Sequence, residues 1–156
     1  MTALANICVD VIVDCPQRQV WDAVTDWPSQ SEWVLATTIR NTANQGIGVG
    51  GSFEAFTGVG RVGVLDPMRI TEWDPPRRVV VKHMGSVVRG WGIFEVFALP
   101  GDRSRFVWSE QLNLPLGHAG RLLWPLVRPV VAAGVRHSLS DFRKQLEAKR
   151  PIVPAS

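Results

Sequence analysis

The sequence lacks several features that mark particular classes of protein. In 156 residues it has no tyrosine, and its basic residues never form a run longer than a pair such as Arg77-Arg78. A nucleic-acid-binding protein usually carries a denser basic stripe, so we expect no nucleic-acid partner despite the net charge of +3. The absence of tyrosine also removes a phenol that could act as an acid on a carbonyl substrate, which counts somewhat against an enzyme.

Segments that would direct the chain to or through a membrane are also missing. Residues 1–14 have no early basic residue and include Asp10 and Asp14, which is not the pattern of a signal peptide. The longest apolar stretch, Leu122–Val135, is interrupted by Arg128 and two prolines and is shorter than the roughly 20 residues that cross a bilayer. We therefore expect a cytoplasmic protein without stable membrane insertion.

Cysteine is scarce, since Cys8 and Cys15 are the only two. They lie seven positions apart along one predicted strand, about 23 Å if it is extended, whereas a disulfide requires Cα atoms within about 7 Å. We expect two reduced thiols, in agreement with a reducing compartment, and interpret both as small buried residues. No glycine-rich phosphate loop and no zinc-like Cys/His spacing is present, so we expect no cofactor and no metal.

What is present predicts an α+β protein. Residues 5–14 alternate as a first strand, Pro16 opens a helix that ends near Thr25, and a short helical segment with two tryptophans follows. From residue 36 onward, short apolar segments separated by Gly, Pro and Asp turns predict six further strands in an antiparallel meander.

A long helix is predicted at the C-terminal end, from about Arg121 to Lys149, with a bend or an interruption at Pro125 and Pro129. Its apolar residues recur at spacings of three and four, which gives one continuous stripe. A sheet must cover its apolar face, and this helix is the only predicted element large enough to do so. We expect residues 1–150 to form a single domain and residues 151–156 a flexible tail.

Five segments resemble, in order and spacing, the START-like (SRPBCC) superfamily of polyketide cyclase/dehydrase and lipid transport proteins. They are Cys15–Trp27, Gly48–Phe53, Arg69–Val80, Arg105–Glu110 and Leu139–Glu147. The resemblance implies the helix-grip, or pollen-allergen-like, fold. In that fold a seven-stranded curved antiparallel sheet wraps round a long C-terminal helix, with two short helices between strands 1 and 2. It also implies a ligand cavity between sheet and helix.

Members of this superfamily differ widely in function. They include aromatase/cyclases acting on polyketides, carriers of sterols, phospholipids or hydrophobic hormones, quinone-binding proteins and chaperone cofactors. Because one fold supports many activities, the function must be argued from the residues of the site.

Glu110 is the residue that most clearly suggests a site. Alternation in FVWSEQL places it on one face of a strand with Phe106, Trp108 and Leu112. An unpaired carboxylate in a filled core would cost several kcal/mol. Glu110 therefore predicts a cavity, where it can meet water, a ligand hydroxyl or a cationic partner.

His83 is the candidate partner of Glu110. In VVVKHM, Lys82 is expected to face water, so Val81 and His83 share the inner face and both line the cavity. One interpretation makes His83 and Glu110 an acid/base pair for enolisation or dehydration of a carbonyl substrate. The other makes them polar groups that orient a ligand, and we favour it because a perturbed pair only sometimes marks chemistry.

Further residues are assigned by type and position. Large apolar side chains and one arginine complete the predicted ligand contacts: Phe53, Arg89, Trp91, Trp124, Val131 and Val135. For Arg89 a solvated side chain is the default interpretation, and contact with a ligand carboxylate or phosphate is the functional one. The glycines on either side of Trp91 suggest bending of the sheet or close backbone approach.

Three further acidic residues are interpreted as surface groups. Alternation does not decide the face of Glu54 or Glu95, and we expect each on the outer face beside a cross-strand Arg or Lys. His137 and Asp141 are four residues apart, a spacing that could hold a metal, but helix geometry turns His137 outward. We expect a hydrogen-bonded surface pair there.

We therefore expect a protein that binds or carries a hydrophobic small molecule, whether a polyketide, an isoprenoid, a quinone or a lipid-like compound. One alternative is a polyketide aromatase/cyclase or dehydratase that uses Glu110 and His83. Another is a protein-interaction module with a collapsed cavity. The apolar segment at residues 120–131 is expected to be buried by the sheet or by a second subunit, with gating or transient membrane contact as its functional interpretation.

Overall fold

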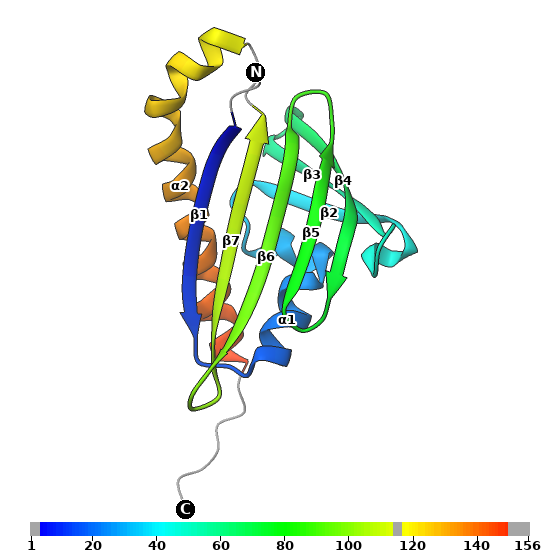
Figure 1. Cartoon of the computed structure of the whole chain (residues 1–156), viewed down its shortest axis with the longest axis vertical. Helices are drawn as coiled ribbons and strands as arrows, with labels where there is room; N and C mark the ends of the chain where they lie inside the picture. The colour runs from blue at the N-terminus through cyan, green and yellow to red at the C-terminus, as the bar shows by residue number, and fades with distance from the viewer. Residues whose placement is uncertain (1–3, 114–116, 150–156) are drawn as a thin grey trace, which may run out of the picture.

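A seven-stranded antiparallel sheet curves around the long C-terminal helix in the computed structural model of the chain (Figure 1). The structure describes residues 4–113 and 117–149. The strands are β1 (Leu4–Val13), β2 (Thr37–Ala43), β3 (Ser52–Val59), β4 (Val62–Asp74), β5 (Arg78–Met84), β6 (Arg89–Leu99) and β7 (Arg103–Asn113). The helices are α1 (Gln17–Thr25), the short 3-10 segments η1 (Trp27–Glu32) and η2 (Asn44–Gly46), and α2 (Gly117–Ala148). The predicted helix-grip fold is confirmed.

The order of strands in the sheet is β1-β7-β6-β5-β4-β3-β2. Strands β2 to β7 form the predicted meander, because each pairs with its neighbour in the sequence, and β1 closes the other edge by pairing with β7. Figure 1 shows the sheet curling so that β2 and β3 lie behind β5 and β6. This curl gives the sheet a concave face, which α1, η1 and α2 cover.

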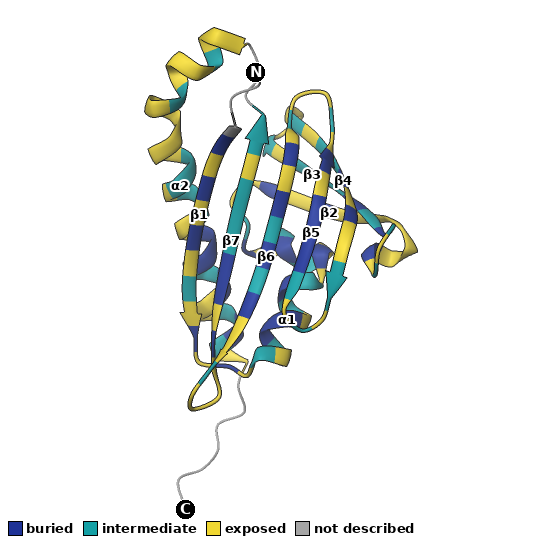
Figure 2. Ribbon diagram, viewed as in Figure 1, coloured by how far each residue is buried: buried dark blue, intermediate teal, exposed yellow. Residues whose placement is uncertain are grey.

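Buried residues alternate with exposed ones along the strands (Figure 2), as a sheet with one covered face requires. Aromatic side chains pack among aliphatic ones in the core beneath that face. Trp27 stacks on Phe53 with ring centroids 4.1 Å apart, and Phe106 meets Phe142 of α2 at 5.5 Å. Trp21 of α1 is also buried and meets Trp73 of β4 edge to face, with ring centroids 5.2 Å apart.

The helix α2 begins at Gly117, earlier than predicted, and runs through Pro125 and Pro129 without interruption. Its ribbon curves along this first half (Figure 1), in line with the predicted bend. At 1.5 Å per residue the 32-residue helix is about 48 Å long, whereas the ten-residue β1 spans about 33 Å. The helix therefore extends beyond the sheet on which its second half packs.

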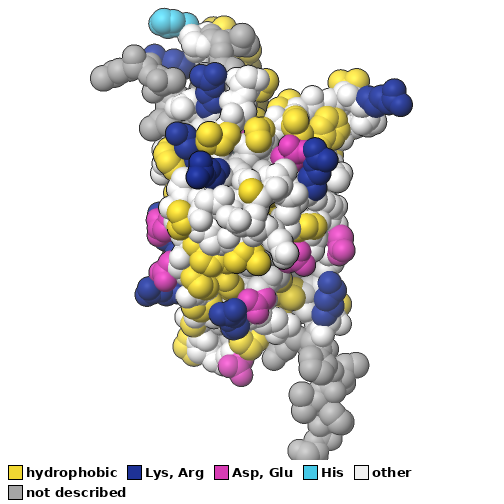
Figure 3. Space-filling model, turned by 90° about the vertical axis from the view of Figure 1, so that its right-hand side faces the viewer, with side chains coloured by type: hydrophobic (Ala, Val, Ile, Leu, Met, Phe, Trp, Pro, Cys, Tyr) yellow, Lys and Arg dark blue, Asp and Glu magenta, His cyan; other side chains and the backbone are white. Residues whose placement is uncertain are grey.

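The predicted burial of the first half of α2 by the sheet is wrong for this reason. Leu122, Leu126 and Val130 are 81%, 72% and 72% exposed, respectively. In the second half, by contrast, Leu139, Phe142 and Leu146 are buried against the sheet. The space-filling view shows hydrophobic side chains exposed in clusters over the face seen there, with Lys and Arg side chains both near its upper end and in its lower half (Figure 3).

The two cysteines differ in burial. Cys15 is buried, but Cys8 is exposed on the outer face of β1, which corrects its interpretation as buried; the two are not bonded to each other. The predicted tail, residues 151–156, lies outside the described residues. Within residues 4–113 and 117–149, no helix combines the length and the apolar character needed to cross a bilayer.

Candidate functional site

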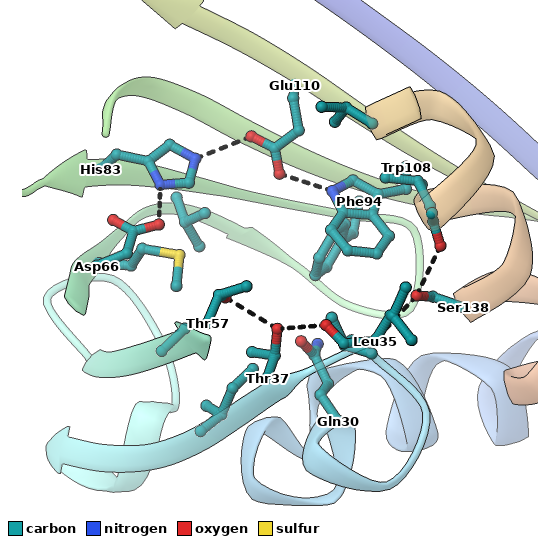
Figure 4. A pocket seen from close by; sticks show the side chains of 18 of the residues that line it. Gln30, Leu35, Thr37, Thr57, Asp66, His83, Phe94, Trp108, Glu110 and Ser138 are labelled. Carbon is teal, nitrogen blue, oxygen red and sulfur yellow. Dashed lines mark hydrogen bonds and ion pairs between the residues drawn. The ribbon is translucent and has the colours of Figure 1, made fainter. Parts of the chain in front are cut away.

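A cavity of about 380 Å³ lies between the concave face of the sheet and α2. Its walls are mainly apolar: Phe53, Val81 and Phe94 line it from the sheet, and Val131 and Val135 line it from the helix. One wall is different, because Asp66, His83 and Glu110 come together there (Figure 4). We refer to these three residues as the charged cluster.

The sheet places His83 and Glu110 on the same face but not on neighbouring strands. His83 is on β5 and Glu110 on β7, with β6 between them. The residue of β6 that lies opposite Glu110 is Gly92. A Cβ atom at Gly92 would lie 2.9 Å from Val81 Cγ2 and 3.3 Å from Glu110 Oε1. Because Gly92 has no side chain, the Glu110 side chain can cross β6 and reach His83.

Both ring nitrogens of His83 are engaged within the charged cluster. Nε2 lies 2.8 Å from Glu110 Oε2, and Nδ1 lies 2.7 Å from Asp66 Oδ2. Asp66 comes from β4, the strand on the other side of β5. The second oxygen of Glu110, Oε1, accepts a hydrogen bond of 2.7 Å from the Trp108 indole N–H. Three different strands and an indole therefore fix the position of these groups (Figure 4).

The surroundings of His83 favour its charged form. Burial lowers its pKa, but the hydrogen bonds to Asp66 and Glu110 and the charges of both carboxylates outweigh burial and raise the pKa of His83 to about 10. At neutral pH the ring is an imidazolium that donates one hydrogen bond to each carboxylate. The charged cluster then holds one positive group between two negative ones.

One atom of the charged cluster has no partner. Asp66 Oδ1 is buried and lacks a hydrogen bond within the part of the chain that the structure describes. A buried acceptor without a donor costs about 1–3 kcal/mol. Such a cost, together with the burial of two carboxylates, is typical of a site kept for function rather than for stability.

The other polar groups of the cavity wall are bonded mainly to the protein itself. Thr37 Oγ1 donates to the Leu35 carbonyl at 3.0 Å and lies 2.9 Å from Thr57 Oγ1. Ser138 Oγ accepts a hydrogen bond of 3.0 Å from the Leu35 N–H and donates to the Gly134 carbonyl at 2.9 Å. These bonds hold the loop around Leu35 against β3 and α2 at the edge of the cavity.

Seven of the twelve predicted ligand contacts line this cavity. They are Phe53, Val81, His83, Trp108, Glu110, Val131 and Val135. The structure brings His83 and Glu110 together, whereas the alternation of their strands predicts only that both line the cavity.

The other five lie outside the cavity wall. Phe106 is wholly buried in the core, Leu112 is partly buried near the end of β7, and Trp124 is partly buried on α2. Arg89 is exposed, and Trp91 is 38% exposed with Lys82 Nζ 5.6 Å from its ring. Arg89 and Trp91 alternate with Gly90 and Gly92, which take the inner positions of β6, so both side chains face outward.

Asp66 is the main site residue that the sequence analysis missed. The alternation of β4 places it on one face with the buried Met68 and Ile70, and this signal was present in the sequence. The pairing of Met68 with His83 across β4 and β5 brings Asp66 within reach of the imidazole, and that register is set only by the folded sheet.

The expected surface pairs are confirmed. Glu54 forms an ion pair with Arg40, which lies directly across from it on β2, and Glu95 pairs with Arg78 at 3.1 Å. His137 and Asp141 form an exposed pair with a distance of 3.2 Å. The close backbone approach expected at β6 is also present, because a Cβ atom at Gly90 would overlap the Gln111 carbonyl oxygen.

A second cavity of about 490 Å³ lies between α1, η1, η2 and the end of β4. Its acidic residues Asp22 and Asp26 are exposed, and Asp22 pairs with Arg18 at 3.0 Å. Of the two cavities, the first combines apolar walls with buried charged groups, the combination found in small-molecule sites. The first cavity is therefore the candidate site.

Comparison with known proteins identifies one family. The model of the family described as polyketide cyclase / dehydrase and lipid transport matches residues 5–147. A comparison with curated proteins finds no match.

Several solved structures share the fold. The protein TTHA0849 from Thermus thermophilus is 15% identical, with a TM-score of 0.79 over 94% of this chain and 100% of that one. The Zhui aromatase/cyclase from Streptomyces sp. R1128 is also 15% identical, with a TM-score of 0.77 over 99% of this chain and 100% of that one. The Aha1 dimer from Colwellia psychrerythraea is 12% identical, with a TM-score of 0.67 over 94% and 99% of the two chains.

Proposed function

The chain belongs to the polyketide cyclase/dehydrase and lipid transport family, and from this premise we propose that it binds or carries a hydrophobic small molecule in the cavity between the sheet and α2. The ligand would be a polyketide, an isoprenoid, a quinone or a lipid-like compound. The observation that carries this proposal is a cavity of about 380 Å³ with apolar walls and one charged cluster.

The size and the lining of the cavity both support this function. Small-molecule sites are concave, mostly apolar and roughly 300–1,000 Å³ in volume, with a few polar groups that orient the ligand. Phe53, Phe94 and Trp108 offer flat apolar surface, while the charged cluster supplies the polar groups. The same volume argues against an interaction module with a collapsed cavity.

Native mass spectrometry tests the proposal, followed by organic extraction of the purified protein. We expect a stoichiometric adduct of one chemical class, or formation of such an adduct on incubation with a panel of lipids, quinones and polyketides. A mass that stays that of the bare chain against the whole panel would contradict the proposal.

A pair of variants shows whether the adduct occupies this cavity. Val135→Trp fills the cavity from the helix side and should abolish the adduct. Val127→Trp makes the same replacement on the same helix, at a residue that is 44% exposed and does not line the cavity, and should leave the adduct unchanged. Equal adducts in both variants would place the ligand elsewhere.

A second candidate function is that of an aromatase/cyclase or dehydratase. The distance of 2.8 Å between His83 Nε2 and Glu110 Oε2, at the wall of an apolar cavity, favours it. In this function the substrate would replace the hydrogen bond between His83 Nε2 and Glu110. Glu110 would then accept a proton from a carbon next to a carbonyl group, and the Nε2–H of His83 would supply a proton to the oxygen. Turnover of the extracted ligand class by the wild type would then fall about 10²–10⁴-fold in Glu110→Gln, while binding is retained.

A further inference from the structure

The charge of the cavity wall points to the chemical class of the ligand. No Lys or Arg is among the described residues that line the cavity. The one positive group, His83, lies between the carboxylates of Asp66 and Glu110 and donates to both. A ligand anion would therefore meet two carboxylates and one imidazolium whose two N–H groups are already used.

The hydrogen-bond donors of the wall are almost all engaged within the protein. Trp108 donates to Glu110. Because Thr37 gives its one hydroxyl hydrogen to the Leu35 carbonyl, Thr57 must donate to Thr37. The hydroxyl of Ser138 donates to the Gly134 carbonyl. Gln30 donates through Nε2 to the Val24 carbonyl at 2.8 Å and retains one amide hydrogen.

Acceptors, by contrast, are left over. A carboxylate can accept about four hydrogen bonds, and each oxygen of Glu110 accepts one from the protein. Glu110 also lies on the cavity wall with 15% of its side chain exposed. A hydroxyl hydrogen of a ligand can therefore bond to Glu110, whereas a ligand carboxylate or phosphate would be repelled by it.

We propose, on the basis of the binding function above, that the cavity selects uncharged hydrophobic ligands bearing a hydroxyl group that donates to Glu110, and rejects ligands that carry a carboxylate or a phosphate. Phenols, enols and hydrophobic alcohols fit this description, and fatty acids and phospholipids do not. Hydrogen bonds to a charged acceptor are roughly twice as strong as neutral ones, so a donor on the ligand contributes to both affinity and orientation.

Three naphthalene compounds of similar size test this selectivity at pH 7: 2-naphthol, 2-methoxynaphthalene and 2-naphthoate. The naphthol is neutral with a donor, the ether is neutral without one, and the naphthoate is an anion. Titration calorimetry on the purified chain should give the lowest Kd for the naphthol. The Kd of the ether should be about tenfold higher than that of the naphthol. The Kd of the naphthoate should also exceed that of the naphthol at least about tenfold.

Matched variants locate the source of the selectivity. Glu110→Gln removes one negative charge from the cavity wall, so the ratio of the naphthoate Kd to the naphthol Kd should fall at least about fivefold. Glu54→Gln removes the same charge from the outer face of the same sheet, beside Arg40, and should leave the ratio unchanged. The wild-type comparison of the three compounds stands on its own if Glu110→Gln does not fold.

The outcomes separate this inference from the binding function. Equal affinity for all three compounds, or tightest binding of the naphthoate, would overturn the inference and leave the binding function standing. An unchanged ratio in Glu110→Gln would overturn the role of Glu110. Failure of all three compounds to bind would overturn the inference and count against the binding function as well, because the apolar rings alone would then find no site.

Discussion

At the scale of single residues, the charge state of His83 decides the character of the cavity. His83 is 7% exposed, and its ring would be neutral if burial acted alone. The hydrogen bonds to Asp66 and Glu110 reverse that preference. If the ring lost its proton, one of these hydrogen bonds would be lost and two carboxylates would remain in an apolar wall with no cation between them.

The raised pKa of His83 predicts a dependence of stability on pH. The folded-state pKa is about 10, against about 6.5 in the unfolded chain. The stabilisation is therefore complete below about pH 6.5 and is lost as the pH rises through 10. Relative to His83→Gln, the free energy of unfolding of the wild type should fall by about 1 kcal/mol per pH unit over this range. Urea denaturation at four pH values measures it, and parallel curves for the two proteins would contradict it.

The alternation of residues along the strands predicted the orientation of most of the charged cluster's neighbours correctly. It placed Trp108 with Glu110, and Val81 with His83, on inner faces because a strand has a period of two. The same rule applied to β4 would have found Asp66. The hydrogen bonds themselves depend on the register of three strands and on the absence of a side chain at Gly92, neither of which one sequence reveals.

At the scale of elements, β6 separates β5 from β7 and still allows side chains of these two strands to contact each other. Its inner face is built from Gly90 and Gly92 where it passes the charged cluster. The Glu110 carboxylate lies over Gly92, where any other residue would place a side chain.

Adding one methyl group to β6 should disturb the charged cluster. In Gly92→Ala the new Cβ atom would lie 2.9 Å from Val81 Cγ2 and 3.3 Å from Glu110 Oε1, so Val81 must shift and the Glu110 carboxylate must give way by a few tenths of an ångström, which weakens its hydrogen bonds. We expect the Kd for a bound ligand to rise about tenfold, in line with the loss of a charge-assisted hydrogen bond.

The control for Gly92→Ala is Gly134→Ala, which also adds a methyl group to the cavity wall. Its Cβ atom would lie 3.9 Å from the nearest atom, Leu35 Cδ2, and would be far less crowded than at Gly92. The Kd of the Gly134→Ala variant for the bound ligand should stay close to that of the wild type. Equal effects of the two substitutions would show that cavity volume, rather than the position of Glu110, determines affinity.

The two halves of α2 should differ in local stability. Leu122 and Leu126 in the first half are exposed, and Pro125 and Pro129 each remove a backbone donor from the helix. Residues 139–148, by contrast, pack on the sheet through Leu139, Phe142 and Leu146. Hydrogen exchange followed by mass spectrometry should show faster exchange for residues 118–130 than for residues 139–148.

Equal protection of the two halves would mean that something covers the first one in solution. Sedimentation velocity would then show whether the cover is a second copy of the chain. This segment is apolar in sequence and was expected to be buried by the sheet or by a second subunit, and only the first of these alternatives is wrong. Burial by the sheet fails because α2 is longer than β1 and extends past its end. This mismatch becomes visible only when the lengths of strand and helix are compared in the folded molecule.

At the scale of the whole molecule, the charged cluster reduces the stability that this fold could have. Buried ion pairs are often no better than apolar residues of similar volume, and replacing them can stabilise a protein by about 1–4 kcal/mol. Here Asp66 Oδ1 adds an unpartnered acceptor within the described part of the chain. The rest of the core, from Trp27 and Phe53 to Phe142, is one cluster of buried apolar residues between the sheet and the helices.

Breaking the charged cluster should therefore cost much more stability than removing it altogether. In His83→Leu two carboxylates stay buried without a cation, so the free energy of unfolding should fall by about 3–5 kcal/mol. The triple variant Asp66→Leu/His83→Leu/Glu110→Leu removes all the charges and leaves only the Trp108 N–H without its acceptor. Its free energy of unfolding should therefore lie above that of His83→Leu and near that of the wild type.

Urea denaturation at pH 7, with and without a ligand identified by extraction, completes the comparison. A bound ligand at a hundred times its Kd raises the free energy of unfolding by about 2.7 kcal/mol, and only the wild type should respond in this way. If the triple variant were less stable than His83→Leu, the cluster would be a stabilising part of the core. If it were stable and still responded to the ligand, apolar contacts alone would account for binding. With stability kept and the response lost, ligand binding would be the property for which the fold retains Asp66, His83 and Glu110.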